Sequence, residues 1–200
     1  MKGAPGVVAS GEYLTVQALL KSASHITGAV LFGLDDRAAS GVVELSSHMK
    51  SGRQPDFGSN KPEIALGAEL AQALRVYPGD KVILLAARGG AAAPVALSAK
   101  VAGVFEVGMY DYDAHTAYLP LSCVRWLQGG RARPGAMVRV ADVFGARSAA
   151  TGLQARLGAD YSVRDWLSLN RNLFYAIRME KMVMFLILLT IVTVAAFNIT

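Results

Sequence analysis

Acidic side chains and a histidine that could take part in acid–base chemistry gather in the segment FEVGMYDYDAH: Glu106, Asp111, Asp113 and His115. If this segment is extended, Asp111 and Asp113 share one face of the strand and the tyrosines beside them share the other. Two carboxylates on one face could act as general acid and general base. A charged strand edge that resists pairing with other chains is the alternative explanation. No companion nucleophile or metal motif favours catalysis.

Elsewhere, the residue types that usually carry catalysis lie in no recognised arrangement. His25, His48 and His115 are far apart, and none belongs to an H-E-x-x-H zinc motif. No G-x-S-x-G elbow occurs, and the glycine-rich stretch ARGGAAAP lacks the pattern of a phosphate-binding loop. Cys123 is the single cysteine, so there is no internal disulfide framework. The sequence therefore predicts no catalytic residue, no metal site and no cofactor.

The elements that position these residues indicate a mixed α/β domain. Segments rich in valine and bounded by Gly, Pro or Asp predict strands at 5–10, 28–35, 81–87, 99–113, 116–121 and 136–142. Apolar spacing and Pro62 in the first turn predict a helix over 62–76, followed by a type II turn at Tyr77–Asp80. A second helix is expected over 142–158 between strands at Met137–Val140 and Tyr161–Val163. This β-α-β piece at the end, and a matching one expected at the start, flank a middle that is rich in strands and turns.

The chain ends in an apolar segment. Met182–Ile199 contains no charged residue, glycine or proline, and about 18 residues make a helix of roughly 27 Å against a hydrocarbon core of about 30 Å. Thr190 and Thr193 are tolerated in such a helix because each hydroxyl can bond to a carbonyl one turn earlier. The alternative, a buried core helix, would usually carry a polar stripe. The segment is predicted to cross a membrane.

A helix is expected to lead directly into this span. Ser162 and Asp165 have capping-box spacing, and apolar residues recur at helical intervals after them, with Trp166 and Tyr175 suited to a membrane interface. The resulting rod would transmit movement between the domain and the bilayer.

The net charge of the chain does not indicate a nucleic-acid partner. The charge of +5 comes from scattered Lys and Arg, without the basic, aromatic-rich block typical of nucleic-acid binding.

Three segments, in this order, resemble one family. PEIALGAELAQALRVYPGDKVILL, VAGVFEVGMYDYDAHTAYLPL and WLSLNRNLFYAIRMEKMVMFLILLTIVTVAAFNI are similar to the LolC/LolE permease subunits of bacterial lipoprotein-releasing ABC transporters, within the MacB/FtsX-like superfamily. The resemblance covers nearly all the chain from Pro5 onward. It implies an α+β periplasmic domain, in which a porter-like α/β subdomain is interrupted by a β-rich subdomain, followed by a transmembrane helix of the bacterial inner membrane.

The resemblance also implies an organisation. Residues 1–161 would form the periplasmic domain, with the β-rich insertion at about 46–119. Residues 162–181 would form a juxtamembrane amphipathic helix and 182–200 a transmembrane helix, with the permease's other transmembrane helices absent from this chain. The implied function is release of lipoproteins from the inner membrane, not catalysis by this chain. The implied partners are a cytoplasmic ABC ATPase that binds ATP, a second permease subunit (sister or self), a periplasmic carrier and acylated lipoproteins.

Residue roles follow from the same resemblance. A hairpin at about 88–98 is the candidate for carrier docking, with Arg88, Gly89, Gly90 and Pro94. The candidates for lipoprotein or lipid contact are Phe174, Ile177, Met182, Met184 and Phe185. Coupling of the domain to the membrane is assigned to Trp166, Asn170, Glu180 and Lys181. Two alternatives stay open: a related permease for macrolide export or cell-wall hydrolase control, and a membrane-anchored binding module or enzyme that uses Glu106–His115.

Overall fold

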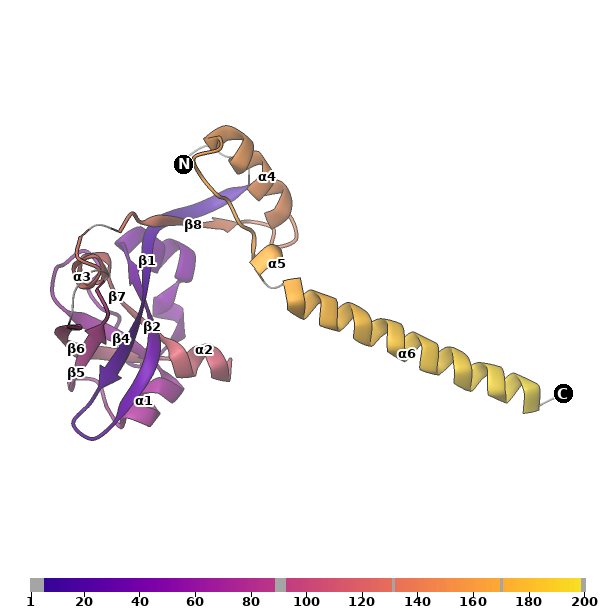
Figure 1. The fold of residues 1–200 in the computed structure, drawn as a ribbon, viewed down its shortest axis with the longest axis horizontal. Coiled ribbons are helices and arrows are strands. Elements are labelled where there is room, and N and C mark those ends of the chain that lie inside the picture. The colour runs from indigo at the N-terminus through magenta and orange to yellow at the C-terminus, as the bar shows by residue number, and fades with distance from the viewer. Residues whose placement is uncertain (1–5, 89–92, 131, 170, 199–200) are drawn as a thin grey trace. The chain divides into compact units, whose positions relative to one another are not determined.

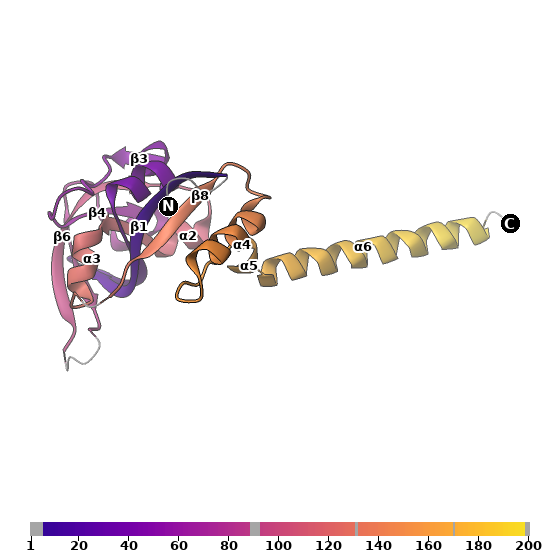
Figure 2. The same cartoon turned by 90° about the horizontal axis from the view of Figure 1, so that it is seen from above.

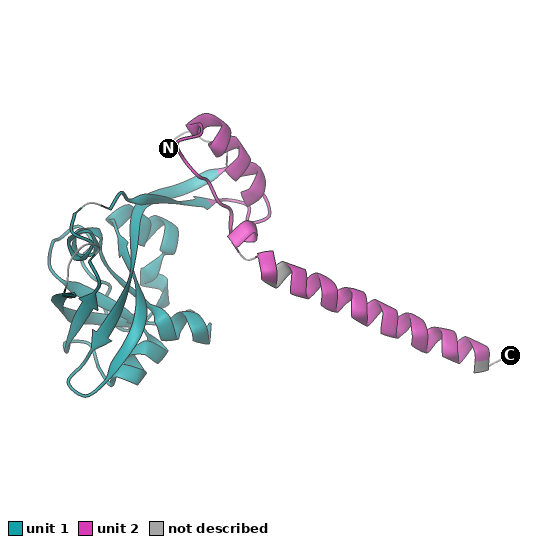
Figure 3. Cartoon of the chain, viewed as in Figure 1, with its two compact units in different colours: residues 1, 7–139 teal, residues 2–6, 140–200 magenta. Residues whose placement is uncertain are grey.

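The computed structural model describes residues 6–88, 93–130, 132–169 and 171–198 (Figure 1). The chain divides into two compact units (Figure 3). The first is Val7–Arg139, and the second runs from Val140 to the C-terminus together with a few residues before Val7.

The first unit is organised around one eight-stranded sheet. Its strands are β1 (Val7–Lys21), β2 (Ile26–Leu34), β3 (Met49–Gly52), β4 (Glu63–Gly67), β5 (Lys81–Ala86), β6 (Val95–Phe105), β7 (Thr116–Pro120) and β8 (Gly135–Val140). Six of them pair in a closed ring, in the order β1–β2–β7–β4–β6–β5 and back to β1. The β2–β7 and β4–β6 pairs are parallel. Closing the ring removes the free edges of these six strands, while β3 and β8 pair on the outside with β6 and β1.

Alternation of side chains explains why these segments form a sheet. In β1, Leu14, Ala18 and Leu20 are buried while the residues between them are more exposed, as expected for a strand with one buried face. The main apolar cluster draws side chains from all six ring strands. It also includes leucines of the helices α1 (Ala68–Leu74) and α3 (Leu121–Leu127). The sheet and these two helices therefore share one core.

A second apolar cluster is aromatic. The Tyr118 ring lies 5.1 Å from the Phe105 ring and 5.8 Å from the Phe32 ring. Its hydroxyl is hydrogen-bonded to that of Tyr112 in the short helix α2 (Tyr110–His115). Burial raises the pKa of Tyr118 far above its ordinary value. The pair is therefore protonated at any physiological pH and holds α2 against the sheet.

The second unit contains the remaining helices, α4 (Ala146–Leu157), α5 (Trp166–Leu169) and α6 (Arg171–Asn198). The predicted helix over 142–158 is confirmed as α4. Its C-terminal side is fixed by Gln154, whose amide donates to the carbonyls of Gly158 and Tyr161 at 2.8 Å each and accepts the Val163 backbone N–H. The strand expected at Tyr161–Val163 does not form, because these backbone groups bond to a glutamine side chain rather than to another strand.

Two further expectations about local structure were wrong. Residues 63–67, expected to begin a helix at 62–76, form β4, which is buried between β6 and β7. The strand expected over 99–113 ends at Phe105, and α2 follows after Gly108, whose φ of 85° turns the chain. The turn at Tyr77–Asp80 is confirmed, with a φ of 105° at Gly79 and a bond from the Asp80 N–H to the Tyr77 carbonyl at 3.1 Å.

The expected β-rich insertion stays a prediction. Residues 46–119 supply β3–β7 to the same sheet as β1 and β2, and they fall within the first unit.

Candidate functional site

The membrane helix has the geometry expected of a bilayer span. Helix α6 is uninterrupted from Arg171 to Asn198 (Figure 2). Tyr175–Phe197 has a mean hydropathy of 2.1, and none of that stretch is buried within the chain. A helix that is apolar all round and has no protein cover needs an apolar environment. By length and composition, α6 is therefore a candidate membrane span.

Polar atoms inside the span are satisfied within the helix. The Thr190 hydroxyl donates to the Leu186 carbonyl at 2.8 Å, and the Thr193 hydroxyl donates to the Leu189 carbonyl at 2.7 Å. These are the back-bonds expected from the sequence. They leave no unpaired hydroxyl to be desolvated at these two positions.

The connection to α6 is built from α5. The Asp165 carboxylate accepts the Ser168 N–H at 2.7 Å, which caps the helix at Trp166. The preceding residues, from Ser162 onward, are not helical. The Trp166 indole N–H donates to the Val143 carbonyl at 3.0 Å and so ties α5 to the loop before α4. Asn170, assigned a coupling role, lies outside the described residues.

The residues predicted to contact lipid lie on more than one face of α6. Met182 and Phe185 are 61% and 67% exposed and lie one turn apart. Ile177 and Met184 are seven residues apart and share a different face. Glu180 and Lys181 are exposed. The side chain of Phe174 lies outside the described residues. A single lipid-binding stripe made of this whole set does not form, and contact of individual residues with lipid remains a prediction.

The hairpin expected at about 88–98 exists as the β5–β6 pair, in which Ala86 is opposite Val95. Pro94 is exposed, and Gly89 and Gly90 lie outside the described residues. The Arg88 side chain binds the end of α3. It donates to the Trp126 carbonyl at 2.6 Å and to the Leu127 carbonyl at 3.4 Å. Its guanidinium carbon lies 5.4 Å from the centre of the Trp126 ring. Arg88 therefore anchors the base of the hairpin.

A pocket of about 430 Å³ adjoins this anchor, lined by Arg88, Ser122, Arg125, Trp126, Gly129 and Gly130. The two glycines have positive φ and return the chain at the end of α3. A side chain at Gly129 would come within 3.1 Å of Arg88. Two arginines make the pocket basic, although Arg125 also faces Glu12 at 3.8 Å.

Removal of the Arg88 anchor is expected to loosen the hairpin. Arg88→Ala removes the side-chain donor of the Leu127 carbonyl and one of the two donors of the Trp126 carbonyl, which also accepts the Gly129 N–H at 3.0 Å. The loss should cost about 1–2 kcal/mol. Limited proteolysis of the native protein measures the effect as faster cleavage between 87 and 94. Arg88→Lys, which keeps the charge but loses the fork of donors, should give an intermediate rate. Unchanged cleavage in the alanine variant would contradict the anchoring role.

The acidic residues considered for catalysis do not form a shared site. Asp113 is buried in α2, and its carboxylate accepts the backbone N–H groups of Val107 and Gly108 at about 3.0 Å. Glu106 pairs with Lys50 at 2.9 Å. The His115 ring bonds to the Asp111 carbonyl. The extended arrangement of Asp111 and Asp113 was wrong because the segment is helical. These contacts are structural, and no group of three metal-binding side chains occurs among the described residues.

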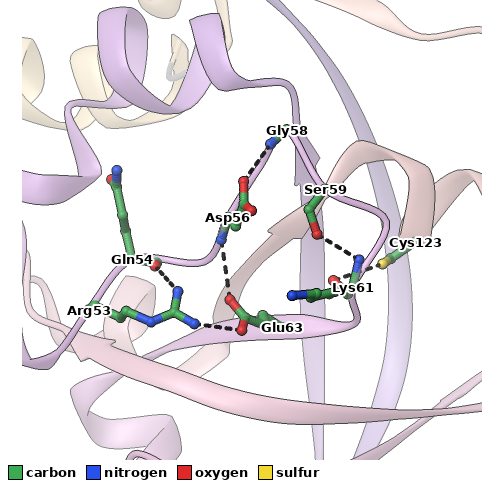
Figure 4. Close-up of polar contacts among 8 residues, drawn as sticks. All are labelled: Arg53, Gln54, Asp56, Gly58, Ser59, Lys61, Glu63 and Cys123. Atoms are coloured by element: carbon green, nitrogen blue, oxygen red, sulfur yellow. Dashed lines mark hydrogen bonds and ion pairs between the residues drawn. The ribbon is translucent and has the colours of Figure 1, made fainter.

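An ion pair that the sequence does not reveal closes the loop between β3 and β4. Figure 4 shows Arg53 beside Glu63, with the guanidinium 2.6 Å from one carboxylate oxygen. The other oxygen accepts the Asp56 N–H at 3.3 Å. The Arg53 hydrogen bond lowers the pKa of Glu63 below its ordinary value of 4.5, and burial opposes this shift. The pair fixes a loop of mostly polar residues.

This pair makes stability depend on pH. Because the pKa of Glu63 is lower in the folded chain, the stabilisation is present above about pH 4.5 and is lost as the pH falls through the lowered value. Glu63→Gln is expected to lower the free energy of unfolding by about 1 kcal/mol at pH 7. The difference should shrink at pH 3 in denaturant titrations. Glu106→Gln, which affects a pair exposed on both sides, is the matched control. A pH-independent difference would contradict this role for Glu63.

Comparison with known proteins places these features in context. No protein-family profile matches the chain. The lipoprotein-releasing system transmembrane protein LolC of Neisseria meningitidis is 32% identical over 200 residues, which cover 96% of this chain and 48% of that protein. LolC of Xylella fastidiosa is 30% identical over 199 residues, covering 97% and 48%. The chain thus spans about half the length of the curated relatives it matches.

Solved structures share the fold. The extracellular domain of YknZ, a noncanonic ABC-type transporter from Gram-positive bacteria, has a TM-score of 0.55 at 20% identity and covers 82% of this chain and 81% of its own. The periplasmic region of MacB from Actinobacillus actinomycetemcomitans has a TM-score of 0.56 at 17% identity, covering 86% and 78%. The predicted fold class is confirmed: a mixed α/β domain with the fold of the YknZ and MacB domains, followed by one apolar helix.

Proposed function

Because the chain is a relative of the LolC/LolE permease subunits over nearly its whole length, we propose that it is part of a transmembrane permease of an ABC transporter. This permease releases lipoproteins from the inner membrane to a periplasmic carrier. The observation that carries the proposal is the match to LolC across both the globular domain and helix α6. The domain lies on the periplasmic side, and α6 crosses the inner membrane.

Energy for the reaction comes from a partner. Each buried acyl CH₂ contributes about 0.8 kcal/mol to membrane binding, so removing several chains from lipid requires an energy source. In this proposal a separate cytoplasmic ABC ATPase supplies it, as the likeness to LolC implies. A second permease subunit, sister or self, completes the membrane part.

The chain's own contribution is mechanical. Arg171–Asn198 is one continuous helix, so displacement of its membrane part also displaces the juxtamembrane turns that contain Ile177, Glu180 and Lys181. At its start, α5 is capped by Asp165 and bonded through Trp166 to Val143. These contacts join α5, which precedes α6 in the chain, to the loop before α4. The hairpin anchored by Arg88 is the candidate for docking the carrier.

Site-specific photo-crosslinking in cells tests the proposal. A photoreactive residue is placed in turn at Ile177, Met182, Met184 and Phe185, and at exposed Tyr77 as a control. We expect acylated lipoproteins to crosslink from at least one α6 position and not from Tyr77, and the yield to rise when ATP hydrolysis is blocked. Crosslinks to phospholipid alone from all four positions would contradict lipoprotein release.

A second candidate is a related permease with another task, such as macrolide export or control of a cell-wall hydrolase. The fold shared with the periplasmic region of MacB is compatible with both candidates. The two candidates share an ATPase partner and differ in cargo. Recovery of an efflux partner or a hydrolase activator, instead of lipoproteins, would select the second.

A further inference from the structure

Cationic side chains gather on one face of α6 where the apolar span begins. Tyr175, Arg178 and Lys181 follow one another at intervals of three residues, so Arg178 lies beside each of the other two on the helix surface. All three are exposed. Within the described part of the chain, no acidic side chain forms an ion pair with Arg178 or Lys181. Around the helix, Glu180 lies about 160° from Arg178 and about 100° from Lys181.

The depth of these residues follows from the continuity of the helix. Lys181 adjoins Met182, the first residue of the uncharged run. With a rise of about 1.5 Å per residue, Arg178 lies about 6 Å from Met182 along the helix axis. The polar headgroup layer on each side of a bilayer is about 5–8 Å thick. Helical side chains tilt toward the N-terminus, which here is the direction out of the hydrocarbon. Both cations therefore reach the level of lipid phosphates.

We propose that Arg178 and Lys181, with Tyr175 beside them, bind the phosphate of an anionic phospholipid in the leaflet that faces the globular domain. Guanidinium and ammonium groups are strong phosphate donors, and tyrosine is enriched at this level of the membrane. The bound lipid fixes the depth of α6 and neutralises two unpaired charges at the edge of the span. The inference rests on α6 crossing the membrane and is independent of the transported cargo.

The chain contains a matched control on the same helix. Arg171 lies seven residues before Arg178 and therefore on the same face. It is about 16 Å from Met182 along the helix axis, which is beyond the headgroup layer of a helix that crosses the bilayer upright. If any cation on this face attracted anionic lipid, removing Arg171 would also weaken lipid binding. If only cations at the depth of the headgroups bind lipid, removing Arg171 would leave the binding unchanged.

Native mass spectrometry of the full-length protein in detergent, titrated with phosphatidylglycerol or phosphatidylcholine, tests the proposal. The wild-type protein should retain phosphatidylglycerol in preference to phosphatidylcholine. Each removed cation should weaken this binding roughly fivefold, so the Arg178→Gln, Lys181→Gln double variant should lose about 25-fold. Arg171→Gln should stay within about twofold of wild type. The charge-preserving exchange Arg178→Lys, Lys181→Arg should bind as wild type does.

Three results would overturn the proposal. They are unchanged lipid binding in the double glutamine variant, an equal loss in Arg171→Gln, and displacement of the lipid by millimolar inorganic phosphate. The last would indicate a site for free phosphate. Thermal unfolding of each variant confirms that it is folded. Because lipid binding is measured without ATP, cargo or carrier, failure here leaves the proposed transport function untouched, and failure of lipoprotein release leaves this inference untouched.

Discussion

Gly67→Ala is expected to destabilise the first unit by about 3 kcal/mol or more. Gly67 ends β4 immediately before α1. A Cβ atom there would lie 2.8 Å from the Asp113 Cα and still closer to the Asp113 carbonyl oxygen. Both are backbone atoms of α2, and the Asp113 carboxylate is itself bonded to Val107 and Gly108. The helix therefore has no easy direction in which to yield.

The effect on Gly67 is steric, because its φ of −62° and ψ of 152° suit any residue. Gly28→Ala is the control: Gly28 lies in β2, and a Cβ atom there would meet nothing within 4 Å. It should change the free energy of unfolding by less than about 0.5 kcal/mol, or raise it slightly. Pulse proteolysis of the detergent-solubilised protein in a urea series measures both. Equal stability of the two variants would contradict the packing described for β4 and α2.

Leu186→Arg is expected to prevent α6 from inserting into a membrane. Leu186 is the midpoint of Tyr175–Phe197 and is 62% exposed within the chain. Replacing a leucine by an arginine at the centre of a span disfavours insertion by roughly 3–4 kcal/mol. Among the residues that the structure describes, none covers this stretch, so none offers the charge a buried partner.

A reporter in which residues 171–198 lie between two glycosylation acceptor sites measures the inserted fraction. The wild-type segment should insert almost completely and the arginine variant in a small minority of molecules. Leu186→Ala, which removes apolar surface without adding charge, should insert nearly as well as wild type. Equal insertion of the arginine variant and wild type would show that α6 is not held by the hydrocarbon core.

The sequence correctly predicted the helices and strands in which the spacing of apolar residues matches the faces that are buried or exposed. The strands at 28–35, 81–87 and 116–121, the helix at 142–158 and the apolar helix α6 carry periodicities that suit one structure only. Residues 63–67 do not: EIALG is a short apolar run, and such a run fits a buried strand as well as a helix. Its pairing with β6 and β7, which are distant in sequence, decides the outcome.

Side-chain contacts explain the other differences between the predicted and the observed local structure. Asp113 accepts two backbone N–H groups and so favours the helix α2, where the valine-rich segment over 99–113 predicted a strand. Gln154 satisfies the backbone around Tyr161–Val163 and leaves it irregular. The helix before the span begins at Trp166, because Asp165 and not Ser162 supplies its cap.

The candidate site was predictable only in part. The membrane span was predictable from composition alone, because an uncharged apolar run is recognised without knowing which other residues it contacts. The anchoring of Arg88 on the carbonyls of Trp126 and Leu127 depends on the fold, as those residues lie nearly forty positions away. The Arg53–Glu63 pair depends likewise on how the loop returns to β4.

The central claim, that this chain is part of an ABC permease, is tested most directly by affinity purification of the native full-length protein in mild detergent. Every co-purifying protein is then identified by mass spectrometry. The account predicts an ABC ATPase in stoichiometric amount together with acylated lipoproteins. Purification without any ATPase, under conditions in which the protein stays folded and membrane-derived, would contradict it.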